Sequence, residues 1–115
     1  MKILDRIVAL LILLLDAIHS AFSPVFRGHY DDAGMWFLSG GLMMIFLGLM
    51  NLVRSAAPGA AARRAALAAN VLGLAFAGAL VPLFPPRHNP QVAVFIVFVA
   101  TATLLTITCR DSATA

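Results

Sequence analysis

The chain has 115 residues, of which 62% are hydrophobic and 11% charged, and its mean hydropathy is +0.96. These values leave too little polar surface to cover a globule in water, so they exclude a soluble protein. They predict an integral membrane protein with a single domain, residues 1–115. The net charge of +3 comes from basic residues in short connections between apolar segments, which indicates membrane topology and no nucleic-acid partner.

The first apolar segment begins like a secretory signal, because Lys2 and Arg6 precede it. Asp16 interrupts the end of this segment, however, and Pro24 would follow the best cleavage position. We therefore expect a retained transmembrane helix over residues 3–23. About 20 residues at ~1.5 Å each span a hydrocarbon core of ~30 Å.

Three further helices are predicted, over residues 33–53, 65–81 and 91–108. The first of them contains no charged residue, and Asp31 or Asp32 can cap its start. The last is rich in Val, Ile and Thr, which also suits a strand, but an unpaired strand cannot lie in lipid. Short connections then predict an all-α, up-down-up-down bundle of four transmembrane helices.

The distribution of Lys and Arg predicts the orientation. The amino end, the second connection and the carboxyl-terminal tail carry six of these residues: Lys2, Arg6, Arg54, Arg63, Arg64 and Arg110. The other side carries two, Arg27 and Arg87. Because cytoplasmic loops hold the excess of positive charge, we expect both termini in the cytoplasm.

Small residues recur on the second and third predicted helices. Gly34, Gly41 and Gly48 are spaced by seven residues, so they make one nearly flat helix face, and Asn51 lies close to it. Membrane helices associate through such faces, and amides such as Asn51 and Asn70 can bond between helices. We expect helix packing here, including contacts to another copy or to a larger membrane complex.

The first helix holds the one stretch where ionisable side chains are expected to interrupt an apolar segment. Asp16, His19, Ser20 and Ser23 are spaced i, i+3, i+4 and i+7, so they share one helix face. An acid in the middle of a membrane helix costs roughly 2.5–3.5 kcal/mol on insertion scales, so it usually faces a protein interior or a wet cavity. We predict a ligand-binding or proton-exchanging site at these four residues.

Two interpretations of this stretch remain open. Asp16 and His19 can form a pair that responds to protons or cations, as transporters use. Alternatively, Asp16 can belong to a structural network with His19 and Ser20 that fixes the register of the helices.

A metal or haem site is a weaker alternative. His19, His29 and His88 all belong to the predicted outer end, and histidine is a ligand for zinc, copper and iron. No fixed spacing such as HExxH accompanies them. The sequence therefore leaves the cofactor unknown.

In length, number of helices and an acid in the first helix, the chain resembles the small multidrug resistance transporters. Asp16 is the residue that carries this resemblance. Those proteins have a weak charge bias that permits antiparallel dimers, whereas this chain has six basic residues against two and lacks their motifs in the third and fourth helices. The sequence therefore assigns the chain to no family.

Two main functions follow from these observations. The first is binding or transport of a small polar or cationic solute, or of protons, in an outward-facing pocket, with Asp16 as counter-ion and His19 as proton partner. The second is a non-catalytic accessory subunit of a larger membrane complex. The chain has no glycine-rich phosphate loop and no nucleophile motif, which argues against an enzyme. The expected partners are the lipid bilayer and a homo-oligomer or larger complex, and compactness favours a bacterial inner membrane.

Overall fold

The fold was obtained as a computed structural model that describes residues 2–28 and 30–109, and the regular elements in these ranges are helices. They are α1 (Lys2–Ala21), the short 3-10 helix η1 (Pro24–Arg27), α2 (Asp32–Ala56), α3 (Ala60–Leu80) and α4 (Pro90–Thr108). Each α-helix is long and apolar enough to cross a membrane. The predicted all-α fold with four transmembrane helices is confirmed.

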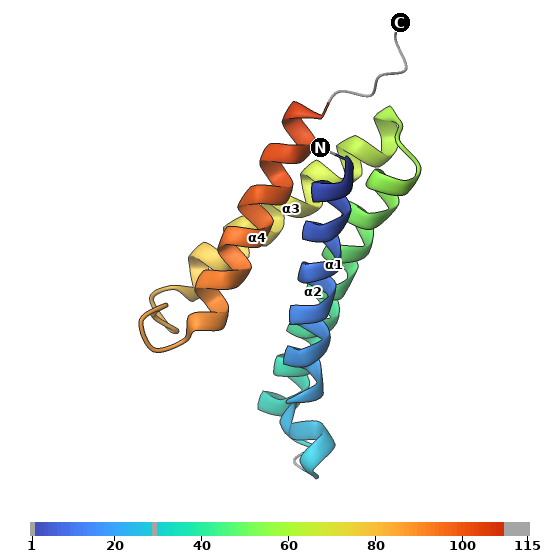
Figure 1. The fold of residues 1–115 in the computed structure, drawn as a ribbon. Helices are drawn as coiled ribbons and strands as arrows, with labels where there is room; N and C mark the ends of the chain where they lie inside the picture. The colour runs from blue at the N-terminus through green and yellow to red at the C-terminus, as the bar shows by residue number, and fades with distance from the viewer. Residues whose placement is uncertain (1, 29, 110–115) are drawn as a thin grey trace, which may run out of the picture.

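The helices form two antiparallel hairpins, α1 with α2 and α3 with α4, in the predicted up-down-up-down order (Figure 1). The start of α1, the turn between α2 and α3, and the end of α4 lie at one end of the bundle, which we call the terminal end. The opposite end, which we call the far end, holds η1 and the connection between α3 and α4 (Figure 1).

The turn between α2 and α3 is shorter than the sequence suggests. The second helix continues to Ala56, and the third begins at Ala60 instead of near residue 65. Alanine is the best helix former, so the run after Gly59 starts a helix at once. As a consequence, Arg54 and Arg63 lie within helices and not in a loop.

The connection between α1 and α2 is fixed by side-chain caps. The backbone N–H of Gly34 donates to Asp31 Oδ1 at 2.7 Å, which confirms Asp31 as the N-cap of α2. Ser23 accepts from the N–H of Val25 at 3.4 Å and donates to the carbonyl oxygen of Gly34 at 3.4 Å. Ser23 therefore joins the end of α1 to the start of α2.

The glycine face of α2 packs directly against α1. Gly34, Gly41 and Gly48 are all buried. A Cβ atom added to Gly41 would collide with the hydroxyl of Ser20, and one added to Gly48 would lie 2.8 Å from Leu13 Cγ. Only glycine lets the two helices approach this closely.

This packing corrects the expectation that small-residue faces receive another copy or a partner subunit. The glycine face is occupied by α1 of the same chain. On α3, the buried Ala66, Gly73 and Ala77 belong to the interior as well, and a Cβ at Gly73 would collide with Leu47 of α2. Both faces therefore hold the bundle itself together.

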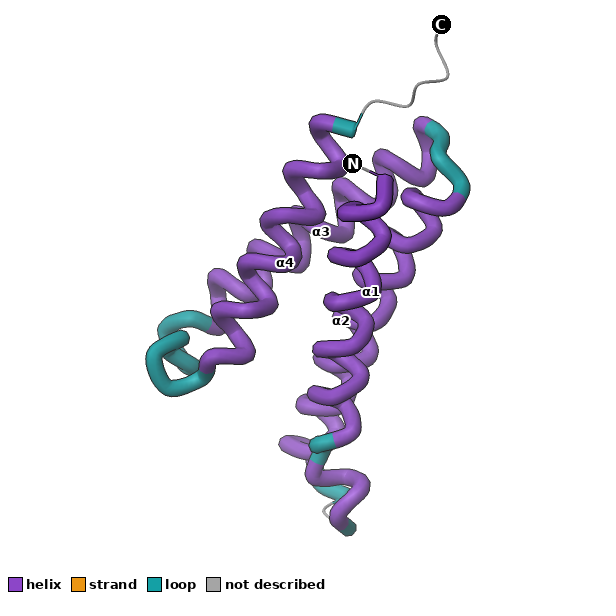
Figure 2. Tube along the Cα trace, viewed as in Figure 1, coloured by secondary structure: helices purple, strands orange, loops and turns teal. Residues whose placement is uncertain are grey.

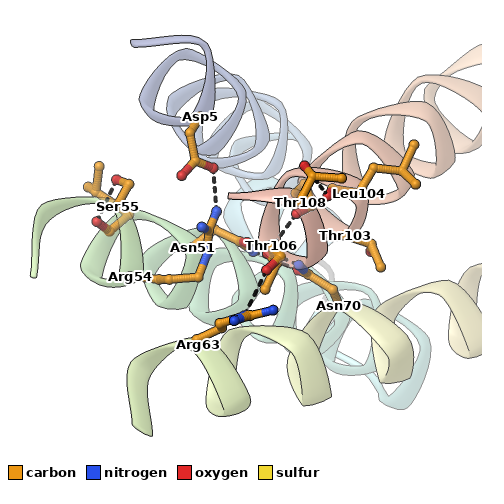
Figure 3. A network of polar contacts seen from close by, with 12 residues as sticks. Asp5, Asn51, Arg54, Ser55, Arg63, Asn70, Thr103, Leu104, Thr106 and Thr108 are labelled. Carbon is orange, nitrogen blue, oxygen red and sulfur yellow. Dashed lines mark hydrogen bonds and ion pairs between the residues drawn. The ribbon is translucent and has the colours of Figure 1, made fainter. Parts of the chain in front are cut away.

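A cluster of polar contacts closes the terminal end (Figure 3). Asn51 of α2 and Asn70 of α3 form two reciprocal amide hydrogen bonds, of 2.6 Å and 3.0 Å, which join the two helices. Arg63 of α3 donates to the carbonyl oxygens of Thr106 and Ile107 at 3.0 Å and 3.2 Å. These carbonyls end α4, whose last turn has no basic residue of its own, so Arg63 supplies the missing cap.

The same cluster contains a buried ion pair that the sequence analysis missed. Arg54 Nη2 of α2 donates to Asp5 Oδ1 of α1, and each residue is only 5% exposed. Asp16 and His19 are therefore not the one place where ionisable groups enter the apolar segments. We call Asp5, Asn51, Arg54, Arg63, Asn70 and Thr106 the terminal polar cluster.

Adjacent glycines of α2 provide a test of the close packing. Gly41→Ala should lower the free energy of unfolding by about 1–3 kcal/mol, because the new methyl group overpacks the contact with Ser20. Gly40→Ala is the matched control: its Cβ would meet nothing within 4 Å, so it should raise stability by up to about 1 kcal/mol. Unfolding by SDS titration in micelles measures both, and equal effects would contradict this packing.

The buried ion pair predicts a non-additive pair of substitutions. Asp5→Leu alone should cost about 3–5 kcal/mol, because it leaves the Arg54 guanidinium buried without its partner. The double variant Asp5→Leu, Arg54→Met should recover most of this loss, since apolar side chains of similar size replace both charges. The same titration measures the coupling, and a single variant as stable as the wild type would refute the pairing.

Candidate functional site

A cleft separates the two hairpins toward the far end. The hairpins lie close together at the terminal end and diverge from there (Figure 2). Between them lies a partly open cavity of about 70 Å³ to which all four helices contribute. Its lining residues are Leu15, Asp16, His19, Met44, Phe76, Ala77, Leu80, Gln91, Val92 and Phe95.

Asp16 is the charged residue in this lining. Its side chain is fully buried, and neither carboxylate oxygen accepts a hydrogen bond from any residue of ranges 2–28 and 30–109. At ~1.5 Å per residue, Asp16 lies about 20 Å along α1 from Lys2, in the half of the helix nearer the far end. Asp16 thus belongs to the wall of the cleft, and its carboxylate oxygens are buried within that wall without a partner among the described residues.

His19 lies one helical turn beyond Asp16, on the same wall. It is half-buried, and its imidazole stacks on the ring of Phe37 of α2, with 4.1 Å between ring centroids and 13° between planes. This stacking fixes the imidazole plane at the edge of the cleft. The cleft therefore brings Asp16 and His19 together, as the helical spacing suggests.

The two serines of the predicted stretch contact α2 and do not line the cleft. The Ser20 hydroxyl is buried against Gly41, and Ser23 caps η1. Helical periodicity places all four residues on one broad face of α1, but α2 covers the side of that face that carries the serines. Ser20 is therefore a packing residue and Ser23 a capping residue.

The alternative interpretation, a structural network around Asp16, requires hydrogen bonds from its neighbours. Among the described residues, Asp16 and the Ser20 hydroxyl both lack hydrogen-bond partners. A buried carboxylate without donors costs stability instead of supplying it. The geometry therefore does not provide the bonds by which Asp16 would fix helix register.

Most of the cleft lining was not identified from the sequence. Met44, Phe76 and Phe95 lie on three other helices, and their types are those of ordinary core residues. Only Gln91 could have been recognised from the sequence as a candidate site residue, because it is a polar residue at the start of an apolar helix, α4. The Asp5–Arg54 pair was easier to predict from the sequence. An antiparallel hairpin brings the start of its first helix beside the end of its second, and these two residues of opposite charge lie at those positions.

Two of the three predicted histidine ligands, His19 and His88, lie within the described residues. His29 lies outside the described residues, and His88 accepts a hydrogen bond from Arg87 Nε at 3.0 Å in the connection between α3 and α4. Within the part of the chain that the structure describes, no three His, Cys, Asp or Glu side chains are grouped so that they could hold a metal ion.

Comparisons with protein-family models, with curated proteins and with solved structures find no match to this chain. The candidate site consequently depends on geometry and chemistry alone.

If Asp16 is not a structural residue, an apolar replacement should stabilise the protein. We expect Asp16→Leu to raise the free energy of unfolding by about 1–3 kcal/mol, because it removes a buried polar group without hydrogen-bond partners. Leu15→Ala, a neighbouring truncation in the same lining, should lower stability instead. Destabilisation by Asp16→Leu in SDS titrations would show that the carboxylate supports the fold.

Proposed function

We propose that this small membrane protein binds a small cationic solute, or a proton, at Asp16, and that it moves this cation across the membrane. The observation that carries the proposal is the fully buried Asp16 carboxylate, which has no partner among residues 2–28 and 30–109 and lies in the wall of a cleft that all four helices line. Ionisable residues kept inside a membrane protein usually mark the pathway of a substrate, ion or proton.

Electrostatics support a cation over an anion or a neutral polar solute. Asp16 is the one charged residue among those lining the cleft, and the apolar side chains around it lower the local dielectric constant. At an effective dielectric constant of 20, two opposite unit charges 4 Å apart attract by about 4 kcal/mol. A neutral solute would gain little here, because Gln91 and His19 are the other polar side chains in the lining.

The orientation of the bundle determines which side the cleft faces. With the terminal end in the cytoplasm, as the distribution of Lys and Arg predicts, the cleft opens toward the outer side. Arg54 contributes little to this charge bias, because Asp5 neutralises it, but the exposed Lys2, Arg6 and Arg64 remain at the terminal end.

Flux in proteoliposomes tests the proposal. The wild-type protein should carry protons or small cations, measured with a pH-sensitive dye and with a panel of labelled ammonium-type and alkali cations. Asp16→Asn should reduce the flux at least about tenfold, because a ~4 kcal/mol charge interaction is lost from the site.

Asp32→Asn is the matched control for this experiment. Asp32 is an exposed acid in the first turn of α2, outside the cleft, so its replacement should leave the flux unchanged. His19→Ala should reduce the flux less than Asp16→Asn, because His19 lies at the edge of the cleft. Equal flux through the wild type and Asp16→Asn for every cation would refute the function.

A further inference from the structure

All four helices meet at one level near the middle of the bundle. A Cβ atom added to Gly73 of α3 would collide with Leu47 of α2 and would lie 3.7 Å from Val99 Cγ1 of α4. A Cβ atom added to Gly48, the residue after Leu47, would lie 3.2 Å from Ile12 Cγ2 of α1. The three apolar side chains at this level are all buried. We call Ile12, Leu47, Gly73 and Val99 the apolar layer.

The apolar layer forms the floor of the cleft. Each helix contributes one lining residue that lies three or four positions, or one helical turn, from its member of the layer: Asp16, Met44, Ala77 and Phe95. All four are displaced toward the far end, because α1 and α3 run toward that end and α2 and α4 run away from it (Figure 1). The cleft therefore stops where the layer begins.

The terminal polar cluster begins one turn away on the other side of the layer. Asn51 follows Leu47 by four residues, and Asn70 precedes Gly73 by three. Both amides are fully buried, and they bond to each other across the bundle (Figure 3). About two turns from the layer lie further buried members of the cluster, Asp5, Arg54 and Thr106. The layer thus separates the cleft from a polar interior.

The apolar layer is thin. Asp16 lies four residues beyond Ile12 on one side, and Asn51 lies four residues beyond Leu47 on the other, which is about 6 Å in each direction. About 12 Å of apolar packing therefore separates the polar groups, compared with a hydrocarbon core of ~30 Å. Apolar constrictions of this kind close the pores of channels by excluding water. The interior has the order of a pathway that is closed at its middle.

The chemistry of the terminal polar cluster suits a pathway better than a packing role. Apolar side chains in place of a buried ion pair are often neutral or stabilising, so Asp5 and Arg54 are not needed to join α1 to α2. Arg54 Nε is buried without a hydrogen-bond partner among the described residues. Ionisable groups inside membrane proteins commonly line the routes of ions and protons. Transport explains why polar groups occupy this end of the interior.

From this order we infer that the apolar layer is the gate of the transport pathway, and that the terminal polar cluster is the inner half of that pathway. The inference rests on the proposed function, because it identifies the barrier between the cleft and the opposite side of the membrane. Leu47 is the residue whose displacement opens the gate, because its side chain fills the space over Gly73.

Proton flux in proteoliposomes, driven by an imposed membrane potential and measured with a trapped pH-sensitive dye, tests the gate. Leu47→Asn keeps the shape of the side chain but admits water to the layer, so it should raise the flux at least about tenfold over the wild type. Val99→Thr, which adds a hydroxyl to the same layer, should raise the flux by a smaller factor. Leu47→Met and Leu49→Asn are the matched controls and should leave the flux unchanged, because the first stays apolar and Leu49 is exposed on the outer face of α2.

A double variant tests the inner half of the pathway. Asn51→Leu with Asn70→Leu replaces both bonded amides by apolar side chains of the same branching, which should change stability little. It extends the apolar layer by one turn, so we expect the flux to fall at least about tenfold below the wild type. SDS titration establishes that each variant is folded. Unchanged flux in a folded double variant would show that the amides only join the helices.

Failure of the gate and failure of the proposed function give different results. If Leu47→Asn and Val99→Thr are folded and conduct no more than the wild type, the layer is not the barrier, while a loss of flux in Asp16→Asn would still support the cation site. If Leu47→Asn raises the flux but Asp16→Asn leaves it unchanged, the layer is the barrier and the function proposed for Asp16 is refuted.

Discussion

The absence of water from the hydrocarbon core is the constraint on which this structure depends, because every buried polar group must find its partner within the protein. The terminal polar cluster meets this requirement for most of its groups: Asp5 with Arg54, Asn51 with Asn70, and Arg63 with the last carbonyls of α4. Asp16 does not, although it is equally buried. The bundle is thus stabilised by polar pairs at one end, and in the half nearer the other end it contains a buried carboxyl group without a partner among the described residues.

The fold keeps Asp16 in place by packing and not by hydrogen bonds. Ser20 and Leu13, on the same helix, lie against Gly41 and Gly48 of α2, so α1 can neither rotate nor slide without breaking close contacts. Rotation of α1 is what would otherwise bring the carboxylate toward lipid or toward a donor. The tight packing at the glycines therefore offsets the free energy that is lost by burying the Asp16 carboxyl group without hydrogen bonds. Such opposition between stability and activity is common at functional sites.

The fold was largely predictable from the sequence, and the site only in part. Hydrophobic length identified the four helices, and the prolines and glycines marked their ends; the third helix begins earlier because Ala60 and the alanines after it propagate a helix wherever the turn allows. Helical spacing correctly brought Asp16 beside His19. It could not predict that α2 covers Ser20, nor that Phe76 and Phe95 complete the lining, because periodicity describes one helix while a cleft is made by the distance between helices. The same limit explains why the glycine face was expected to contact another copy.

The position of the cleft follows from where the hairpins are joined. Asn51 with Asn70 holds the first hairpin to the second, and Leu47 packs over Gly73 near the middle of the helices. The two pairs of helices diverge toward the far end (Figure 1). A cation at Asp16 would touch walls from both hairpins and so add an attraction between them. Binding energy at the cleft would then act against the separation of the hairpins, with the terminal polar cluster as the fixed end. Under the proposed function, occupancy of the site and the angle between the hairpins would be thermodynamically coupled, because ligand binding and helix packing would act on the same distance.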